Sequence, residues 1–327
     1  MSGKIIVTLP LPEAALTPLR ERFEVEVWEQ SAATSPEGLF ARLADAQGVL
    51  CSLGTQLSAE TISQLADLKV ISSISVGVDH INLAAATTMG IPVGHTPGVL
   101  VDSTADLALA LMLAATRRVS EADRFIREGR WQSGWDTGFF LGTDLSRATV
   151  GLVGMGPIGQ AVAKRLAGFG TRVIVWNRTR REVPGLEWVE WVELDDLFAR
   201  ADIVSLHTAL NDDTAGLVSE ERLAAMRDGS VLINTARGGL VNEPALVTEL
   251  QSGRLRAGLD VYTVEPLPTD SPLLGLDNVV LLPHLGSATA ATRQAMLERA
   301  LVNLVAGMTG ARVPYCANPA VFEGDLP

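Results

Sequence analysis

The sequence contains few cysteines, histidines and lysines. Only two of its 327 residues are cysteines and four are histidines. None stands at the spacing of zinc ligands, so we expect neither a disulfide framework nor a metal site. The three lysines, Lys4, Lys69 and Lys164, lie outside any GxxxxGK[ST] loop. Kinase chemistry and Schiff-base chemistry are therefore not expected.

Positive charge and long apolar runs are also scarce. The chain has 26 basic and 38 acidic residues, and its net charge of −12 disfavours binding to nucleic acid and to anionic membranes. Its longest apolar run, residues 107–115, is much shorter than the ~20 residues of a membrane-spanning helix. The first residues resemble a strand and not a signal peptide, so we expect a cytoplasmic protein with no nucleic-acid or membrane partner.

What the sequence does contain is a repeated alternation of strand-like and helix-like segments. With 47% apolar and 20% charged residues, its composition is that of a folded globular protein, and its length suggests two domains. Short β-branched runs are separated by amphipathic stretches, which predicts parallel α/β sheets. The expected strands are residues 4–9, 23–28, 47–51, 69–75 and 91–93 in the first half, and 150–153, 172–176, 202–206, 231–234, 255–260 and 279–282 in the second.

The alternation is interrupted at a turn-rich stretch, residues 94–98, which precedes an apolar helix expected at 101–116. We interpret this stretch as a crossing between domains, and a last long helix at 290–308 as the return. The fold class predicted is α/β, with two doubly wound parallel-sheet domains. One domain, residues 100–286, is then inserted in a discontinuous domain formed by residues 1–99 and 287–327.

Residues 119–148 form an aromatic segment with little regular periodicity. It contains Trp131, Trp135, Phe139 and Phe140 in a stretch rich in Gly, Asp and Thr. The rings could pack on their own domain. We favour an arm that grips a second subunit, because aromatic residues are enriched at interfaces.

A glycine-rich motif, Gly154-Met155-Gly156-Pro157-Ile158-Gly159, lies between a predicted strand and a helix expected at residues 160–169. Gly154 allows a tight turn, Gly156 allows the backbone to approach a pyrophosphate, and Gly159 allows the helix to pack closely on the strand. The helix N-terminus then offers free N–H groups to the phosphates. This context predicts a dinucleotide site. We therefore expect residues 100–286 to form a Rossmann NAD(P)-binding domain, inserted in a discontinuous flavodoxin-like substrate domain formed by residues 1–99 and 287–327.

The cofactor preference is indicated by the end of the next strand. Where an NAD site usually places an acidic residue against the ribose, this sequence has Asn177. Without that carboxylate a 2′-phosphate is not repelled, and Arg178, Arg180 and Arg181 are cations suited to bind it, with the Thr179 hydroxyl beside them. We therefore predict NADP(H) as the preferred cofactor and NAD(H) as a possible one. The alternative is a solvated basic turn.

The candidate catalytic residues are polar residues that follow predicted strands, since ligands of open α/β sheets bind at the carboxyl ends of the strands. Among the four histidines, His207 and His284 stand there, and the small residues after His284 leave its imidazole accessible for proton transfer. Arg237 has a guanidinium fork that suits a substrate carboxylate, and Glu265 beside a histidine would favour the imidazolium. Taken singly, each could instead be a structural or surface residue.

Six motifs give the chain a resemblance to a known family. They are Ser75 to Asp79, Thr96-Pro97-Gly98, Gly154 to Gly159, Asn234 to Gly238, Asp260 to Leu267, and Pro283 to Ser287. Over nearly its full length the chain resembles the D-isomer-specific 2-hydroxyacid dehydrogenases, and within them the glyoxylate/hydroxypyruvate reductases. It departs from the usual pattern at Asn82, Asp106 and Asn242, and in the adenine-side stretch around Thr208 and Asn211.

The resemblance implies that Arg237, Glu265 and His284 are the catalytic residues. It also implies a homodimer joined through the aromatic arm, whose Phe139 or Trp135 would reach the neighbouring active site. The residues expected to contact substrate are Leu53, Val76 and Gly77 (the last two through backbone N–H groups that receive the carboxylate), Phe139, Arg237 and His284. The residues expected to contact the cofactor are Thr104, Gly154, Gly156, Pro157, Ile158, Asn177, Arg178, Thr179, Arg181, His207, Thr208, Ala209, Thr214, Thr235, Ala236, Asp260 and Gly286.

The predicted function is therefore NADPH-dependent reduction of a small 2-keto acid, glyoxylate or hydroxypyruvate, to the D-2-hydroxy acid. Two alternatives stay open. One is a reductase of larger 2-keto acids such as 2-ketogluconate. The other, of a different class, is a nucleotide-sensing corepressor or scaffold on the same fold.

Overall fold

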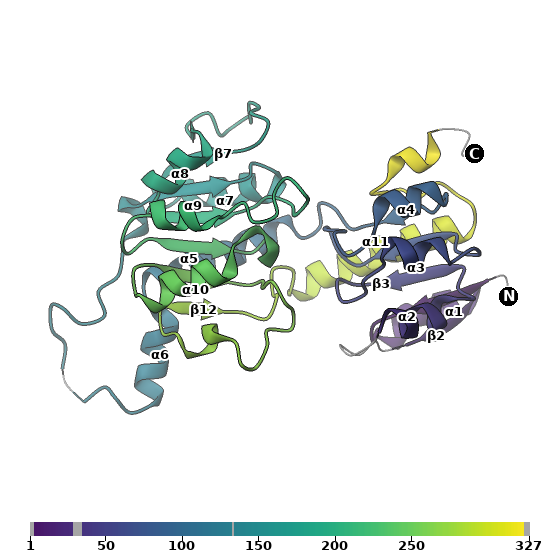
Figure 1. Ribbon diagram of the computed structural model, residues 1–327, viewed down its shortest axis with the longest axis horizontal. Helices are drawn as coiled ribbons and strands as arrows, with labels where there is room; N and C mark the ends of the chain where they lie inside the picture. Colours follow the sequence, from purple (N-terminus) through teal and green to yellow (C-terminus); the bar gives the residue numbers. More distant parts are fainter. Residues whose placement is uncertain (1–2, 29–34, 133, 324–327) are drawn as a thin grey trace. The chain divides into compact units, whose positions relative to one another are not determined.

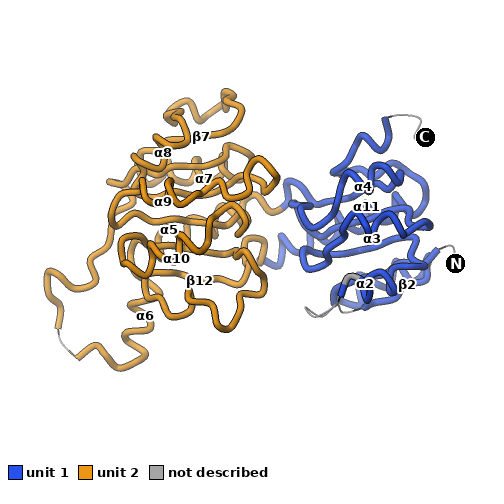
Figure 2. Tube along the Cα trace, in the orientation of Figure 1, with its two compact units in different colours: residues 1–99, 289–327 blue, residues 100–288 orange. Residues whose placement is uncertain are grey.

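The computed structural model describes residues 3–28, 35–132 and 134–323, and the chain divides into two compact units. Unit 1 consists of residues 1–99 and 289–327, and unit 2 of residues 100–288 (Figure 2). The chain therefore passes from one unit to the other twice. No helix within the described ranges is both long and apolar enough to cross a membrane.

Unit 1 is built on a five-stranded sheet whose strands are all parallel (Figure 1). Its strands are β1 (Lys4–Val7), β2 (Glu24–Val27), β3 (Gly48–Cys51), β4 (Val70–Ser73) and β5 (Val93–Gly94). The strand order β2-β1-β3-β4-β5 is that of flavodoxin-like folds.

Both faces of this sheet are covered by helices, because successive residues of a strand point to opposite faces. Ile6 belongs to one buried cluster, while Ile5 and Val7 belong to another. The second cluster includes Ala300 and Leu304 from the last helix, and the Ser72 hydroxyl on β4 donates to the carbonyl of Ala300 at 2.8 Å. The helices of unit 1 are α1 (Glu13–Arg20), α2 (Pro36–Leu43), α3 (Ala59–Ser63), α4 (Leu83–Thr88) and α11 (Ala290–Met308), with the short 3₁₀ helix η4 (Pro319–Phe322).

Unit 2 is built on a seven-stranded parallel sheet in the order β12-β11-β10-β9-β6-β7-β8. Counted from its own first strand, β6, this is the 3-2-1-4-5-6 order of Rossmann folds with one strand added. Its strands are β6 (Thr149–Val153), β7 (Arg172–Trp176), β8 (Glu190–Trp191), β9 (Ile203–Leu206), β10 (Val231–Asn234), β11 (Arg256–Leu259) and β12 (Val279–Leu281). The predicted fold class, two doubly wound parallel sheets, is confirmed.

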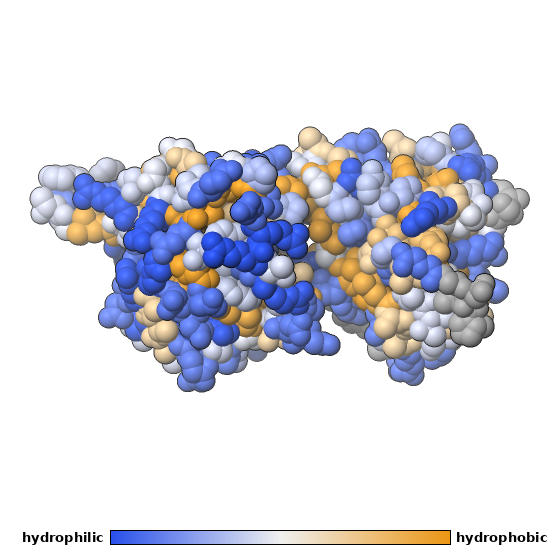
Figure 3. Space-filling model, turned by 90° about the horizontal axis from the view of Figure 1, so that it is seen from above, coloured by the Kyte–Doolittle hydropathy of each residue, from blue (hydrophilic) through white to orange (hydrophobic). Residues whose placement is uncertain are grey.

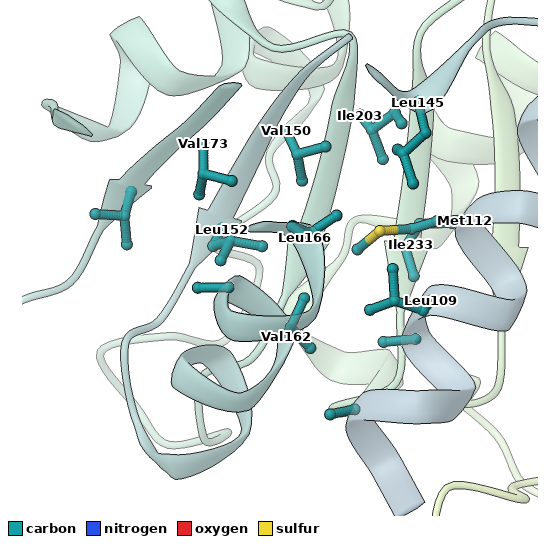
Figure 4. Packing of buried hydrophobic residues seen from close by; sticks show 14 of the residues in the cluster. Leu109, Met112, Leu145, Val150, Leu152, Val162, Leu166, Val173, Ile203 and Ile233 are labelled. Atoms are coloured by element: carbon teal, nitrogen blue, oxygen red, sulfur yellow. The ribbon is translucent and has the colours of Figure 1, made fainter. Parts of the chain in front are cut away.

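The core of unit 2 also has two layers. Val150 and Leu152 pack with Leu109 and Met112 of helix α5 and with Val162 of helix α7 on one face of the sheet (Figure 4). The intervening strand residues pack on the other face beneath α8, α9 and α10. The helices are α5 (Val101–Thr116), α6 (Val119–Arg127), α7 (Pro157–Ala167), α8 (Leu194–Arg200), α9 (Glu220–Ala225) and α10 (Glu243–Gln251), with 3₁₀ helices η1 (Leu145–Arg147), η2 (Gly238–Leu240) and η3 (Pro272–Gly275).

Two local predictions were wrong, and one short strand was missed. Helix α7 begins at Pro157 and not at residue 160, because a proline needs no hydrogen-bond partner at the first helical position. The first nine residues of the aromatic segment form helix α6, where little regular structure was expected, although its apolar residues Val119, Ala122 and Ile126 recur at helical spacing. Strand β8 was not predicted, since two residues are too few to show alternation.

Candidate active site

The glycine-rich turn between β6 and α7 has the geometry that a bound pyrophosphate requires. Gly154 has a φ of +107°, and a Cβ at this position would collide with the backbone of His207. A Cβ on Gly159 would overlap the carbonyl of Gly154, whereas one on Gly156 would meet open space. Helix α7 starts directly after Gly156, so its first N–H groups are available to an anion. The turn therefore fits the diphosphate of a dinucleotide.

Asn177 connects this turn to the loop after β7. Its Oδ1 accepts a hydrogen bond from the Met155 N–H at 3.0 Å, and its Nδ2 donates to the carbonyl of Thr179 at 2.8 Å. The Arg178 guanidinium pairs with Asp213 at 2.7 Å, and both side chains are exposed. Arg180 lies over the ring of Trp191, and Arg181 is exposed. An exposed ion pair contributes at most about 1 kcal/mol, so an anion can readily displace Asp213 from Arg178.

The loop after β9 places His207 beneath the glycine-rich turn. Neither ring nitrogen of His207 has a hydrogen-bond partner within the part of the chain that the structure describes, and burial lowers the pKa of the imidazole to about 4. His207 is therefore neutral at physiological pH. The Thr214 hydroxyl donates to the carbonyl of Ala209 at 2.7 Å and accepts from the Asn211 N–H at 2.9 Å, so it braces this loop.

A histidine–glutamate pair lies at the carboxyl ends of β11 and β12. The Nδ1 atom of His284 is 2.7 Å from Oε2 of Glu265, whose Oε1 accepts from the Tyr262 N–H at 3.0 Å. Burial acts to raise the pKa of the Glu265 carboxyl, but the hydrogen bond from His284 and the charges of His284 and Arg237 hold it below its usual range. The carboxylate keeps the proton on Nδ1, which leaves Nε2 of His284 for proton exchange with a substrate.

The turn that carries His284 is fixed on several sides. His284 has a φ of +56°, which is unusual for a residue with a side chain, and its N–H donates to the carbonyl of Asp260 at 2.9 Å. The Asp260 carboxylate accepts from the N–H groups of Leu285 and Gly286, and the Thr104 hydroxyl donates to the carbonyl of Gly286. Burial raises the pKa of Asp260, and these two backbone hydrogen bonds oppose the rise. Asp260, Thr104 and Gly286 thus serve to position the histidine.

Arg237 follows β10, the strand next to β11. The turn before it is held by Asn234, whose Nδ2 donates to the carbonyl of Arg237 and whose Oδ1 accepts from the Ala236 N–H. A Cβ on Gly238 would overlap the backbone of Tyr262, so this turn packs against the loop that carries Glu265. Unit 2 therefore brings together Arg237, Glu265 and His284 from the ends of three adjacent strands.

Asn234 and Tyr262 are positioning residues that the sequence analysis did not single out. The Tyr262 hydroxyl donates to the carbonyl of Leu282 at 2.9 Å, and burial raises its pKa to about 12. The amino-acid type of each residue could have indicated its role. An asparagine that ends an apolar strand is suited to cap a turn, and a buried tyrosine needs a partner for its hydroxyl. Thr235, beside Asn234, has a buried hydroxyl with no partner among the described residues.

The remaining substrate candidates lie in unit 1 and in the aromatic segment. Leu53 follows β3, and Val76 and Gly77 follow its neighbour β4, so their loops share one edge of the sheet. Phe139 packs against the rings of Phe125 and Phe140, with centroids 5.7 and 4.8 Å apart.

Known proteins resemble this chain in both sequence and structure. Residues 109–286 match the family described as D-isomer specific 2-hydroxyacid dehydrogenase, NAD binding domain. A glyoxylate reductase of Korarchaeum cryptofilum is 41% identical over 325 residues, which cover 99% of this chain and 98% of the relative. A solved protein from Thermus thermophilus has a TM-score of 0.87 and 46% identity, and covers 96% of this chain and 99% of its own. An NADPH-dependent glyoxylate/hydroxypyruvate reductase from Sinorhizobium meliloti, solved with NADP and malonate, has a TM-score of 0.85 and 32% identity, with 97% of each chain covered.

Proposed function

Because the chain belongs to the D-isomer specific 2-hydroxyacid dehydrogenase family, we propose that it reduces glyoxylate or a similarly small 2-keto acid to the D-2-hydroxy acid, with NADPH as the preferred cofactor. The observation that carries this proposal is the 2.7 Å contact between His284 and Glu265, next to Arg237 at the end of the neighbouring strand. The similarity to a glyoxylate reductase and to an NADPH-dependent glyoxylate/hydroxypyruvate reductase supports the substrate class.

His284 is the proton donor in this proposal. Its Nδ1 is hydrogen-bonded to Glu265, so Nε2 is the atom that gives a proton to the carbonyl oxygen of the keto acid. The turn from Gly154 to Gly159 would hold a nicotinamide cofactor, which would supply the hydride for the reduction. The turn held by Asp260 keeps the imidazole in place while the proton moves.

Arg237 has two roles in the proposal. Its guanidinium binds the substrate carboxylate and polarises the carbonyl that is reduced. We assign the other contacts of the carboxylate to the N–H groups of Val76 and Gly77, and the contact with the substrate side chain to Leu53.

The experiment that tests this function is a set of initial rates with glyoxylate, hydroxypyruvate, pyruvate and 2-ketogluconate, each with NADPH and with NADH. We expect the highest kcat/KM for glyoxylate or hydroxypyruvate with NADPH. A preference for 2-ketogluconate would retain the chemistry and change the substrate. Tight NADPH binding without turnover of any keto acid would contradict the proposal and favour a nucleotide-sensing scaffold.

Cofactor preference is assigned to Arg178. Replacing it by alanine is expected to raise the KM for NADPH about tenfold and to change the KM for NADH less than about twofold, because only NADPH has a 2′-phosphate for the guanidinium. The matched variant Asp213→Asn removes the competing carboxylate that pairs with Arg178, and should lower the KM for NADPH. Equal changes for both cofactors in Arg178→Ala would disprove the 2′-phosphate assignment.

We also propose that the chain forms a homodimer through α6 and the segment after it, which stand away from the sheet of unit 2 (Figure 1). Helix α6 buries no side chain, and Ile126 and Trp135 are 56% and 82% exposed. Apolar residues lie among hydrophilic ones at this projecting end, at the left edge of the molecule in Figure 3. Apolar and aromatic surface of this kind is typical of subunit contacts.

Sedimentation velocity tests the dimer. The wild-type chain should sediment as a dimer, and the double variant Ile126→Ser/Trp135→Ser should shift toward the monomer because it loses apolar contact area. Trp188→Ser is the matched control, since Trp188 is an exposed tryptophan of unit 2 outside the arm. A wild-type monomer, or an unchanged dimer in the double variant, would contradict the proposed interface.

A further inference from the structure

The loop after β4 has three successive carbonyl groups that are each held by a hydrogen bond. The carbonyl of Ser75 accepts from the Thr96 N–H at 2.8 Å, and that of Val76 accepts from Nδ1 of His95 at 3.0 Å. The carbonyl of Gly77 accepts from the Ser75 hydroxyl at 2.7 Å. All of these residues belong to unit 1, and Ser75 is buried.

These contacts determine where the N–H groups of the loop point. A trans peptide is planar, so the C=O of one residue and the N–H of the next point in opposite directions. The carbonyls of Ser75 and Val76 are both drawn toward residues 95 and 96, whereas in an extended strand successive carbonyls alternate. The N–H groups of Val76 and Gly77 are therefore both directed away from that segment, toward a common side.

Two neighbouring N–H groups with this orientation form a small anion-binding concavity. Neither the Val76 N–H nor the Gly77 N–H donates to another group of residues 3–28, 35–132 or 134–323. Both residues are half-buried. The loop thus presents two available donors that a carboxylate can accept.

The Ser75 hydroxyl is itself held in one direction. Its hydrogen is given to the carbonyl of Gly77, so Oγ of Ser75 accepts from the Ser73 hydroxyl at 2.7 Å. Ser73 then accepts in turn from Nε2 of His80 at 3.0 Å. Ser73, Ser75 and His80 are buried, so the chain from His80 to Gly77 is shielded from competing water.

We propose that His95 and Ser75 are positioning residues, which hold the Val76 and Gly77 N–H groups in the orientation that receives the substrate carboxylate; the inference rests on the proposed function. His95 does so from the segment after β5, the strand next to β4, through the hydrogen bond that its ring gives to the Val76 carbonyl. Ser75 fixes the peptide that follows Gly77 and so prevents the loop from rotating.

The test compares His95→Leu, which removes the donor, with His95→Asn, which keeps an N–H donor near the position of Nδ1. We expect His95→Leu to raise the KM for glyoxylate about tenfold, the effect of losing one partly buried hydrogen bond, with a smaller change in kcat. His95→Asn should restore most of the KM, and Ser75→Ala should raise it in the same way as His95→Leu. The KM for NADPH should stay unchanged throughout.

Ser72→Ala is the matched control. Its hydroxyl is also buried on β4 and also donates to a carbonyl, but that carbonyl belongs to Ala300 in α11. Ser72→Ala should therefore leave the KM for glyoxylate unchanged even where it lowers the melting temperature. If Ser72→Ala raised this KM as much as Ser75→Ala, the effect would be general destabilisation and the inference would be wrong.

Calorimetric binding of oxamate, a small carboxylate analogue, separates the inference from the proposed function. If the wild type reduces glyoxylate and His95→Leu keeps the wild-type KM, the function stands and the inference fails. If the wild type reduces no keto acid, the function fails, and oxamate binding decides the inference: about tenfold weaker binding by His95→Leu and by Ser75→Ala supports it. Equal affinity, or no binding to the wild type, overturns it.

Discussion

Replacing His284 by alanine is expected to lower kcat for glyoxylate reduction about a thousandfold, within the range that general acid catalysis contributes. The side chain removed is the one whose Nε2 supplies the proton, while Nδ1 is held by Glu265 at 2.7 Å. The glycine-rich turn that fits the cofactor is formed by other residues, Gly154 to Gly159. The Kd for NADPH, measured by fluorescence titration, should therefore change less than about twofold.

Glu265→Gln is the companion variant. The glutamine can still accept a hydrogen bond from the His284 ring but carries no charge. We expect kcat to fall, but less than in His284→Ala, because the imidazole stays in place. In the wild type the pKa of Glu265 is held below its usual range, so this group stays ionised throughout the neutral and mildly acidic range.

The outcome that would refute the proton transfer assigned to His284 is a loss of NADPH affinity in His284→Ala as large as the loss of kcat.

Both sheets could be predicted from the sequence because their central strands are buried on two faces. Strands β9 and β10 are entirely buried, and such short apolar runs between amphipathic stretches leave a strong pattern. Strand β8 and helix α6 were not predicted. Strand β8 has only two residues, too few to show alternation. Helix α6 buries none of its side chains, but its apolar residues Val119, Ala122 and Ile126 recur at helical spacing, so the signal for this helix was present in the sequence.

The candidate site could be predicted in part for a different reason. In a parallel sheet the carboxyl ends of all strands lie at one edge, so polar residues after β10, β11 and β12 must be neighbours. This places Arg237, Glu265 and His284 together without any knowledge of side-chain contacts.

The contacts that hold those three residues in place could not be predicted from the sequence. Asp260 binds the N–H groups of Leu285 and Gly286, which are more than twenty residues away along the chain. Gly238 is required by its close approach to the backbone of Tyr262. Such pairings depend on the turn that each loop adopts, and the local sequence does not specify it.

Replacing Arg237 by glutamine is expected to lower kcat/KM for glyoxylate about a thousandfold. KM should rise and kcat should fall, because the guanidinium charge interacts with the substrate in the ground state and in the transition state. Arg237→Lys should recover only a small part of this loss, since an ammonium group lacks the planar fork that binds a carboxylate in two places. Arg227→Gln is the matched control. Arg227 also lies in unit 2, is largely exposed and pairs with Asp202, so its loss should leave both constants unchanged.

A substrate without a carboxylate separates the two roles of Arg237. Glycolaldehyde has a carbonyl group to be reduced but no carboxylate, so the wild type should reduce it slowly and Arg237→Gln should reduce it with a smaller further loss than for glyoxylate. The difference between the two losses measures the binding of the carboxylate, and the loss that remains measures the polarisation of the carbonyl. Equal losses for both substrates would mean that Arg237 does not bind the carboxylate. That result would leave the anion to the N–H groups of Val76 and Gly77, and would make the loop after β4 the main determinant of acid recognition.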